Sequence, residues 1–275
     1  DTASIMRLSG TLSGFPASVG RVCRLYNDTA ETFRAMAASI DAATHHVNAL
    51  YYQTSWDEYT APFYEALERA VARGVTVRLL VDHHGMRTIP GHKDFRRRLN
   101  AMGIEWHEML PFAPLRGQIR RPDLRNHRKI LVIDGREAYV GSHNLVAPDY
   151  DTPSYAKSGM LYDDTSVSVT GPIVAQIQAV FAVDWYYACK EILTPEVLTP
   201  PAAQLAAKNE DTHISAMQII PSGPAFKGEP NLRAFVHMVS LARTHVSITS
   251  PYFIPDETLM TALTNAALSG VEVEL

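Results

Sequence analysis

The spacing of hydrophobic residues divides most of the chain into alternating helices and strands. After Asp28 or Thr29, either of which can cap a helix, apolar residues recur every three or four positions, as in a helix that buries one side. The run 130–133 has no polar alternation, which is typical of a strand covered on both faces. The pattern predicts an α/β sheet, with helices at 29–40, 61–73, 93–101 and 172–187 and strands at 47–52, 75–81, 104–107, 130–133, 138–141 and 165–169.

The dipeptide Asp134-Gly135 separates two of these strands and predicts a two-residue hairpin turn. A simple turn of this kind pairs Lys129 with Val140 and places His127 opposite Ser142, so that the partner numbers sum to 269. A bulged turn would shift this register by one residue.

The last part of the chain resembles its beginning. Val47 and Gly74 find counterparts in Val246 and Gly270, at offsets of 199 and 196 residues, with a helical pattern between them in both copies. This self-similarity predicts an internal repeat whose second copy stops after two helices and two strands. The predicted organisation is an approach segment (1–20), a complete first domain (21–193), a linker rich in Pro and Ala (194–212) and the opening part of a second domain (213–275).

Composition excludes several classes of protein. With 46% hydrophobic and 20% charged residues in 275, the chain is typical of a globular protein, and its net charge of −4 gives no overall attraction to nucleic acid or anionic lipid. No run reaches the roughly 18 apolar residues that a membrane-spanning helix needs. The pairs His45-His46 and His83-His84 lack supporting carboxylate or cysteine spacing, so no metal site is predicted.

One local segment departs from this balance. Residues 115–129 contain six basic residues and one acidic residue, a net charge of +5. At about 1 kcal/mol for each basic residue near an anionic membrane, such a patch would attract lipid, although a solvated arginine-rich loop is the alternative. The predicted lipid patch consists of Arg116, Arg120, Arg121, Arg125 and Arg128. Aromatic residues at strand ends, such as Tyr51, Tyr52 and Trp56, could line an acyl-chain groove or belong to the core.

The candidate chemistry lies next to this segment. His127 and Lys129 are two residues apart on an expected strand, so both side chains leave on the same face. Each residue has a structural explanation when taken alone, such as a solvated basic loop, a turn residue at Asp134 or a strand-end hydrogen bond. Their joint pattern is more specific, because His-x-Lys-x4-Asp is followed by Gly-Ser-x-Asn at 141–144.

With this motif and its extension, the chain resembles the phospholipase D superfamily. Within it, the resemblance is to the bacterial cardiolipin synthases. The resemblance implies a phospholipase D-type mixed sheet covered by helices on both faces, with one complete repeat and a truncated second one. It is carried by the local sequences at 125–129, 164–165, 171–172, 181–185, 221–224 and 251–257.

The resemblance also implies an enzyme that transfers a phosphatidyl group. A histidine attacks the phosphodiester to form a covalent phosphohistidine, and a second histidine, from the other repeat, protonates the leaving alcohol. The implied substrates are two molecules of phosphatidylglycerol, the products are cardiolipin and glycerol, and no metal or other cofactor is implied. The implied catalytic residues are His127, Lys129, Asp134, Asn144 and Asp164, of which Lys129 and Asn144, with Ser142, would hold phosphate oxygens. Asp164 is expected to orient the histidine ring and Asp134 to be more structural.

The implied partners are the phospholipid substrate, a membrane surface and a second His-Lys-Asp half, which either the same polypeptide or a second chain would supply. The chain alone is expected to be inactive, and its catalytic domain to be peripheral at the cell membrane of a bacterium, with any anchor outside this sequence. Three alternatives stay open: a single-motif dimeric nuclease or phosphodiesterase, a phospholipid hydrolase that uses water, and a non-catalytic scaffold that retains the site. Nucleic acid is not the expected partner.

Overall fold

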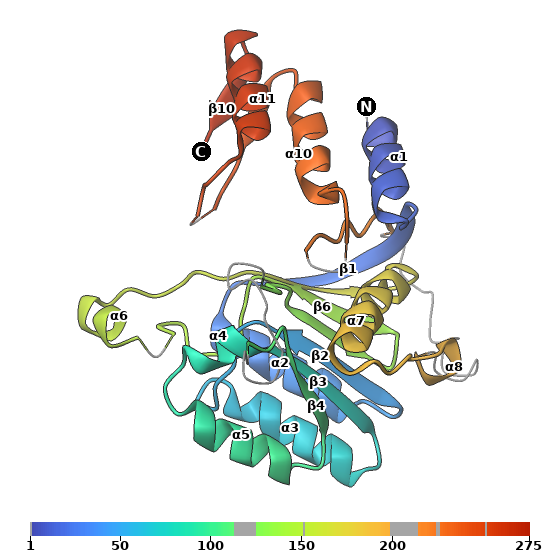
Figure 1. Ribbon diagram of the computed structural model, residues 1–275, viewed down its shortest axis with the longest axis vertical. Coiled ribbons are helices and arrows are strands. Elements are labelled where there is room, and N and C mark those ends of the chain that lie inside the picture. The colour runs from blue at the N-terminus through green and yellow to red at the C-terminus, as the bar shows by residue number, and fades with distance from the viewer. Residues whose placement is uncertain (1, 113–124, 151, 199–213, 224–225, 251) are drawn as a thin grey trace. The chain divides into compact units, whose positions relative to one another are not determined.

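The computed structural model describes residues 2–112, 125–150, 152–198, 214–223, 226–250 and 252–275, which form two compact units (Figure 1). The larger unit comprises residues 19–217 and the smaller one residues 1–18 together with 218–275. Most of the predicted linker lies outside the described residues, so the predicted domain boundaries stay a prediction.

The larger unit is built on an eight-stranded mixed sheet with the strand order β4-β3-β2-β5-β6-β7-β1-β8. Strands β2, β3 and β4 are parallel, whereas β2-β5, β5-β6, β6-β7 and β7-β1 are antiparallel pairs. Its strands are β1 (Ser18–Tyr26), β2 (His46–Tyr51), β3 (Thr76–Asp82), β4 (Glu105–Met109), β5 (Ile130–Ile133), β6 (Glu137–Gly141), β7 (Ser166–Thr170) and β8 (Ser215–Met217). Its helices are α2 (Thr29–Asp41), α3 (Ala61–Ala72), α4 (His83–Arg87), α5 (His92–Ala101), α6 (Pro153–Ser158), α7 (Ile173–Cys189) and α8 (Pro195–Leu198).

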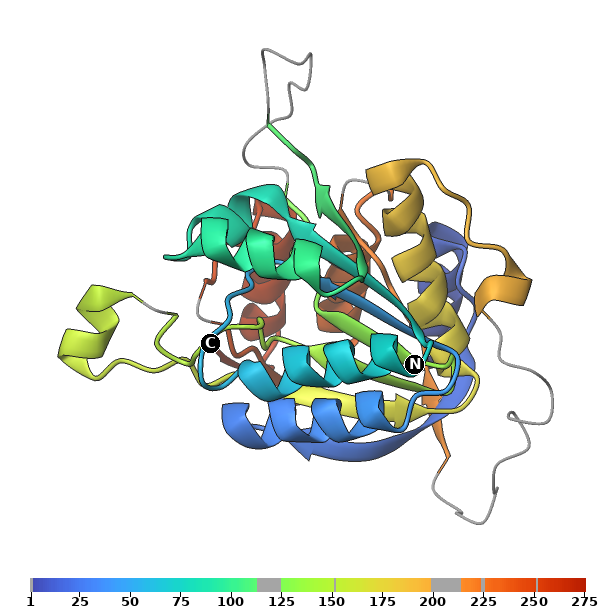
Figure 2. The same cartoon turned by 90° about the horizontal axis from the view of Figure 1, so that it is seen from below.

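Helices cover both faces of this sheet, as expected. Alternate residues of β2 and β3 face α2, α3 and α5, and Figure 2 shows α2 and α3 side by side. The intervening residues face α7, where the ring Nε2 of His46 lies 2.9 Å from Gln178 Oε1. The core on the α2 and α3 side is formed by Phe33, Met36, Ile40, Val47, Ala49, Tyr51, Phe63, Leu67, Leu79, Phe95 and Leu131.

The internal repeat is visible in the structure. In the smaller unit, α10 (Pro230–Leu241), β9 (His245–Ser247), α11 (Glu257–Leu268) and β10 (Glu272–Glu274) follow the same order as α2, β2, α3 and β3. Both strand pairs are parallel, and Val246 pairs with Val273 as Val47 pairs with Val77. These partners are related by the offsets of 199 and 196 residues, so the sequence alignment of the two copies is confirmed.

The segment expected to lead into the first domain contains a helix, α1 (Thr2–Ser13), which packs against α10 despite its Ser and Gly content, and the first residues of β1. One expectation about local structure is wrong. In the hairpin, Ile133 pairs with Glu137 instead of Arg136, so partner numbers sum to 270. Asp134 and Gly135 both have positive φ angles and Arg136 adds an unpaired residue, which is the bulged form of the turn.

Candidate active site

The two basic motif residues lie in the irregular segment that precedes β5, where Tyr52 contacts both of them. The exposed ring of His127 stacks on the Tyr52 ring, with 3.8 Å between centroids and an interplanar angle of 25°. Lys129 Nζ lies 5.6 Å from the centroid of the same ring and donates a hydrogen bond of 2.6 Å to the carbonyl of His127. The tyrosine therefore holds the imidazole and the ammonium group side by side. The two residues were expected on a strand, but β5 begins only after them, at Ile130.

Tyr52 follows β2 directly and is fixed by α4. A Cβ atom added at Gly85 would lie 2.1 Å from the Tyr52 carbonyl oxygen, so this close approach requires glycine. The carboxylate of Asp82 accepts hydrogen bonds from the backbone N–H groups of His84 and Gly85 and caps α4 in this position. Packing at the ends of β2 and β3 thus sets the ring on which His127 rests.

The electrostatic environment favours an uncharged imidazole. Desolvation, with a further contribution from the charge of Lys129, lowers the pKa of His127 to about 4. Desolvation also lowers the pKa of Lys129 to about 8, while the charge of Asp164 acts in the opposite direction. At neutral pH the site therefore combines a neutral histidine, whose free nitrogen can attack an electrophile, with a cation for an anionic group.

The Gly-Ser-x-Asn segment lies beside the same strand end. The Asn144 side chain is 6% exposed, and its Oδ1 accepts a hydrogen bond of 3.0 Å from the backbone N–H of Gln53, the residue after Tyr52. Gly141 is required because a Cβ atom would lie 2.2 Å from the carbonyl oxygen of Thr165. The Ser142 hydroxyl accepts a hydrogen bond of 2.9 Å from the backbone N–H of Thr165, so it acts here as a strand-end group.

Asp164 joins this group through a tyrosine. Tyr150 Oη accepts a hydrogen bond of 3.1 Å from Asn144 Nδ2 and donates one of 3.2 Å to Asp164 Oδ2. Among the residues that the structure describes, no hydrogen bond joins Asp164 to His127. The orienting role of Asp164 therefore stays a prediction, whereas its charge acts on Lys129.

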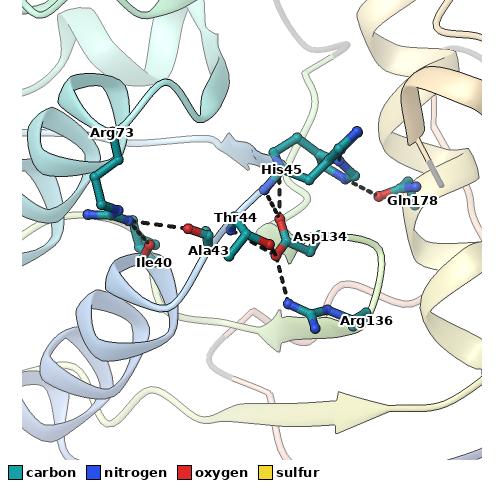
Figure 3. Close-up of polar contacts among 9 residues, drawn as sticks. Ile40, Ala43, Thr44, His45, Arg73, Asp134, Arg136 and Gln178 are labelled. Atoms are coloured by element: carbon teal, nitrogen blue, oxygen red, sulfur yellow. Dashed lines mark hydrogen bonds and ion pairs between the residues drawn. The ribbon is translucent and has the colours of Figure 1, made fainter. Parts of the chain in front are cut away.

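Asp134, whose polar contacts are drawn in Figure 3, lies at the other end of β5, and its exposed fraction is 0%. Its Oδ1 accepts hydrogen bonds from the backbone N–H groups of His45 and His46, and its Oδ2 accepts them from Thr44 and from the guanidinium of Arg136. Burial raises the pKa of Asp134, but the hydrogen bonds outweigh it and the net pKa lies below its usual value. The third residue of the motif thus ties the start of β2 to the β5–β6 hairpin, away from His127.

Two arginines of the predicted lipid patch are buried in ion pairs and do not form an open surface. Arg128 Nη1 lies 2.9 and 2.7 Å from the two carboxylate oxygens of Asp184 on α7, and the Arg128 side chain is 14% exposed. Arg125, 7% exposed, lies 3.8 Å from Asp82. The two cations therefore neutralise the buried carboxylates of Asp82 and Asp184. Arg116, Arg120 and Arg121 lie outside the described residues.

Asp184 also anchors the segment that carries His127. Asn126 Nδ2 donates a hydrogen bond of 3.0 Å to Asp184, and Asn126 Oδ1 accepts one of 3.0 Å from the backbone N–H of Arg128. Both neighbours of His127 are therefore anchored to one buried carboxylate, which is 2% exposed.

Two histidines of the adjacent pairs, His46 and His83, have structural partners. His46 is bonded to Gln178, and desolvation lowers its pKa to about 4, while His83 is paired with Glu108. The part of the chain that the structure describes contains no group of three or more metal-ligating side chains. It also contains no helix of the length and hydrophobicity needed to cross a bilayer.

Three residues around the site were not assigned these roles from the sequence. Tyr52 could be recognised only as an aromatic residue after a strand, which is more often a core position. Tyr150 and Asp184 lie 6 and 40 residues beyond Asn144, and nothing in local spacing shows that they reach it or its neighbours. A tyrosine soon after Gly-Ser-x-Asn and an acidic residue on a largely apolar helix face are the signals that could have found Tyr150 and Asp184.

Comparison with known proteins gives a consistent result. Residues 36–185 match the family described as cardiolipin synthase, PLD-like domain. The chain is 32% identical over 274 residues to a cardiolipin synthase of Geobacillus kaustophilus and 33% identical to cardiolipin synthase 2 of Bacillus cereus, covering 98% of this chain in both cases. These matches cover 52% and 51% of the relatives, so the chain spans about half the length of the curated relatives it matches.

Among solved structures, phosphatidylserine synthase of Haemophilus influenzae is similar in fold, with a TM-score of 0.62 and 14% identity. The alignment covers 97% of this chain and 64% of that one.

Proposed function

We propose that this chain, which belongs to the cardiolipin synthase, PLD-like domain family, provides half of the active site of a phosphatidyltransferase. In the reaction we propose, two molecules of phosphatidylglycerol give one cardiolipin and one glycerol through a covalent phosphohistidine at His127. The observation that carries the proposal is the neutral imidazole held against Tyr52 beside the Lys129 cation.

The first step forms a bond between a ring nitrogen of His127 and phosphorus. The bond from phosphorus to the glycerol oxygen breaks, and a second histidine protonates the leaving glycerol. Lys129 and the remaining N–H of Asn144 stabilise the negative charge on the equatorial phosphate oxygens. A pKa of about 4 supports His127 as the nucleophile, because a general acid would have to carry its proton at neutral pH.

The second step reverses the first with a different alcohol. A hydroxyl of the second phosphatidylglycerol loses its proton to the second histidine and attacks phosphorus, and the bond between phosphorus and nitrogen breaks. Cardiolipin is released and His127 becomes neutral again. Water must be excluded from the phosphohistidine during this step, otherwise phosphatidic acid is formed.

The second histidine would come from a second His-Lys-Asp half, on the same polypeptide or on another chain. Two observations support this part of the proposal: the repeat of α2, β2, α3 and β3 in the smaller unit, and the span of about half of the curated relatives. Without that half, the chain is expected to be inactive.

A bacterial membrane is the proposed place of action, since the substrate is a phospholipid. Because Arg125 and Arg128 are engaged with buried carboxylates, any attraction of the basic segment to anionic lipid would depend on Arg116, Arg120 and Arg121. Phospholipid hydrolysis is the second candidate function, and the exposed position of His127 supports it because water can reach an open phosphohistidine.

The test is to express the protein with any downstream sequence its gene encodes and to incubate it separately with labelled phosphatidylglycerol vesicles and with single-stranded DNA. Cardiolipin plus free glycerol would support the proposal. Phosphatidic acid alone would indicate the hydrolase, cleaved DNA the nuclease, and no turnover the scaffold. The His127→Ala variant should lose both turnover and any acid-labile phosphoenzyme, and retained activity would refute the assignment.

A further inference from the structure

Tyr150 connects the two polar residues of the site that do not touch His127. Its hydroxyl accepts a hydrogen bond from Asn144 and donates one to Asp164, at 3.1 and 3.2 Å. A phenol that both donates and accepts fixes the distance between its two partners. The three side chains form a connected polar network in which each member constrains the next.

The bridge determines which atoms of Asn144 stay available. Its Oδ1 is occupied by the backbone N–H of Gln53, which also fixes the orientation of the amide. One of the two hydrogens on Nδ2 is directed to Tyr150, so a single N–H is left for a ligand. On Asp164, the bond from Tyr150 occupies Oδ2 and leaves Oδ1 toward other groups.

The backbone holds Tyr150 in an uncommon conformation. Its φ angle is +55°, in the left-handed region that a bulky residue rarely adopts. Its N–H donates to the carbonyl of Ala147 at 2.9 Å, and its ring packs against Tyr162 with 4.5 Å between centroids. Such a conformation is retained where the surrounding structure determines it, often at functional sites.

Tyr150 also lies at the root of the segment that carries α6, which extends away from the sheet in both views (Figures 1 and 2). The N–H of Tyr162 donates a hydrogen bond of 2.9 Å to the carbonyl of Pro148, which joins the two ends of this segment. The segment thus begins a few residues after Asn144 and ends just before Asp164, and the Tyr150 hydroxyl is hydrogen-bonded to the side chains of both residues.

We infer that Tyr150 is a positioning residue, which holds the Asn144 amide and the Asp164 carboxylate in place for the phosphate group bound at Lys129. The inference rests on the proposed function and deepens it, because it assigns the geometry of the phosphate site to a residue outside the motif.

The test compares Tyr150→Phe with Tyr155→Phe, which removes the same atom from a tyrosine of α6 whose hydroxyl forms no hydrogen bond within the described part of the chain. Two quantities are measured on the protein expressed with any downstream sequence: the affinity for inorganic phosphate by calorimetry, with Lys129→Ala as the control for the site, and the single-turnover rate of phosphoenzyme formation. Loss of a hydrogen bond to a charged group predicts that Tyr150→Phe slows this rate about 10- to 100-fold. It should also weaken phosphate binding at least about five-fold, whereas Tyr155→Phe stays within about two-fold of the wild type.

A double-mutant cycle separates positioning from general stability. If Tyr150 acts through Asp164, adding Tyr150→Phe to Asp164→Asn should cause less than about a three-fold further loss. Fully additive losses, or a Tyr150→Phe variant that behaves like Tyr155→Phe, would overturn the inference.

The two proposals can fail separately. Phosphate binding that depends on Lys129 and Tyr150, without cardiolipin formation, would reject the function and support the positioning role. Cardiolipin formation unaffected by Tyr150→Phe would do the reverse. If the wild type neither binds phosphate nor turns over, both are wrong.

Discussion

Replacing Asp134 by alanine should destabilise the larger unit without removing the chemistry. The substitution leaves three backbone N–H groups without an acceptor: that of His46, which is buried, and those of Thr44 and His45, which are partly buried. An unsatisfied buried donor costs about 1–3 kcal/mol and a partly buried one less, so with the His46 donor near the upper end we expect a total loss of about 3–5 kcal/mol in the free energy of unfolding. Arg136 adds little, because its half-exposed guanidinium can turn to water.

Urea unfolding followed by circular dichroism measures this loss. With an m-value of about 2 kcal/mol/M, the unfolding midpoint should fall by about 1.5–2.5 M. The pKa of Asp134 is lowered from its usual 3.8, so its contribution is present above that pH and disappears as the pH falls through the lower value of the folded state. The difference in stability between wild type and Asp134→Asn should therefore shrink below about pH 4.

The matched control is Asp164→Ala, which removes a carboxylate that is partly exposed. It should shift the midpoint by less than about 0.5 M and still reduce phosphoenzyme formation, the opposite of the result expected for Asp134→Ala under folding conditions. The reasoning would be refuted if Asp134→Ala kept the wild-type midpoint and lost the phosphoenzyme, since that outcome requires a direct role in the reaction.

Three further changes test other parts of the structure. Activity should decline as the pH rises through about 8, where Lys129 loses its charge. In the pH–rate profile of Lys129→Arg this decline should lie at higher pH, because the guanidinium keeps its charge. A decline at the same pH in this variant would show that another group causes it. Asp184→Ala should cost about 3–5 kcal/mol in urea unfolding, because Arg128 loses the buried carboxylate that neutralises its charge. The double variant Arg128→Met/Asp184→Leu should recover most of this loss, and no recovery would contradict the ion-pair explanation. Gly85→Ala should displace Tyr52 and slow phosphoenzyme formation at least about ten-fold, and a rate like that of the wild type would show that the stacked ring is dispensable.

The sequence predicted the elements whose hydrophobic period is long and regular. Helices α2, α3 and α7 and the buried strands β2, β3 and β5 lie within one or two residues of their expected bounds, since one strongly apolar face determines each of them. The internal repeat was also predictable, down to the pairing of Val246 with Val273. The register of the hairpin was not predictable, because Asp134-Gly135 is compatible with both a simple and a bulged turn.

The site was predictable in its residue types and less so in their contacts. His127, Lys129, Asn144 and Asp164 could be selected from the motif and the resemblance, but local spacing does not show the contacts that Tyr52 and Tyr150 make with them. The arginines show the same limit, because a basic segment predicts an anionic partner without saying whether that partner is a lipid or a buried carboxylate such as Asp184. Pairing with buried groups depends on tertiary structure, which local patterns do not contain.

The most direct measurement is the mass of the covalent intermediate. The protein, expressed with any downstream sequence, is mixed with phosphatidylglycerol of defined acyl chains, quenched within milliseconds under conditions that preserve phosphohistidine, and digested for mass spectrometry. Our account predicts a phosphatidyl group on the peptide that contains His127, its absence in His127→Ala, and its disappearance when cardiolipin forms. A phosphatidyl group on another residue, or cardiolipin formation by the His127→Ala variant, would contradict the account.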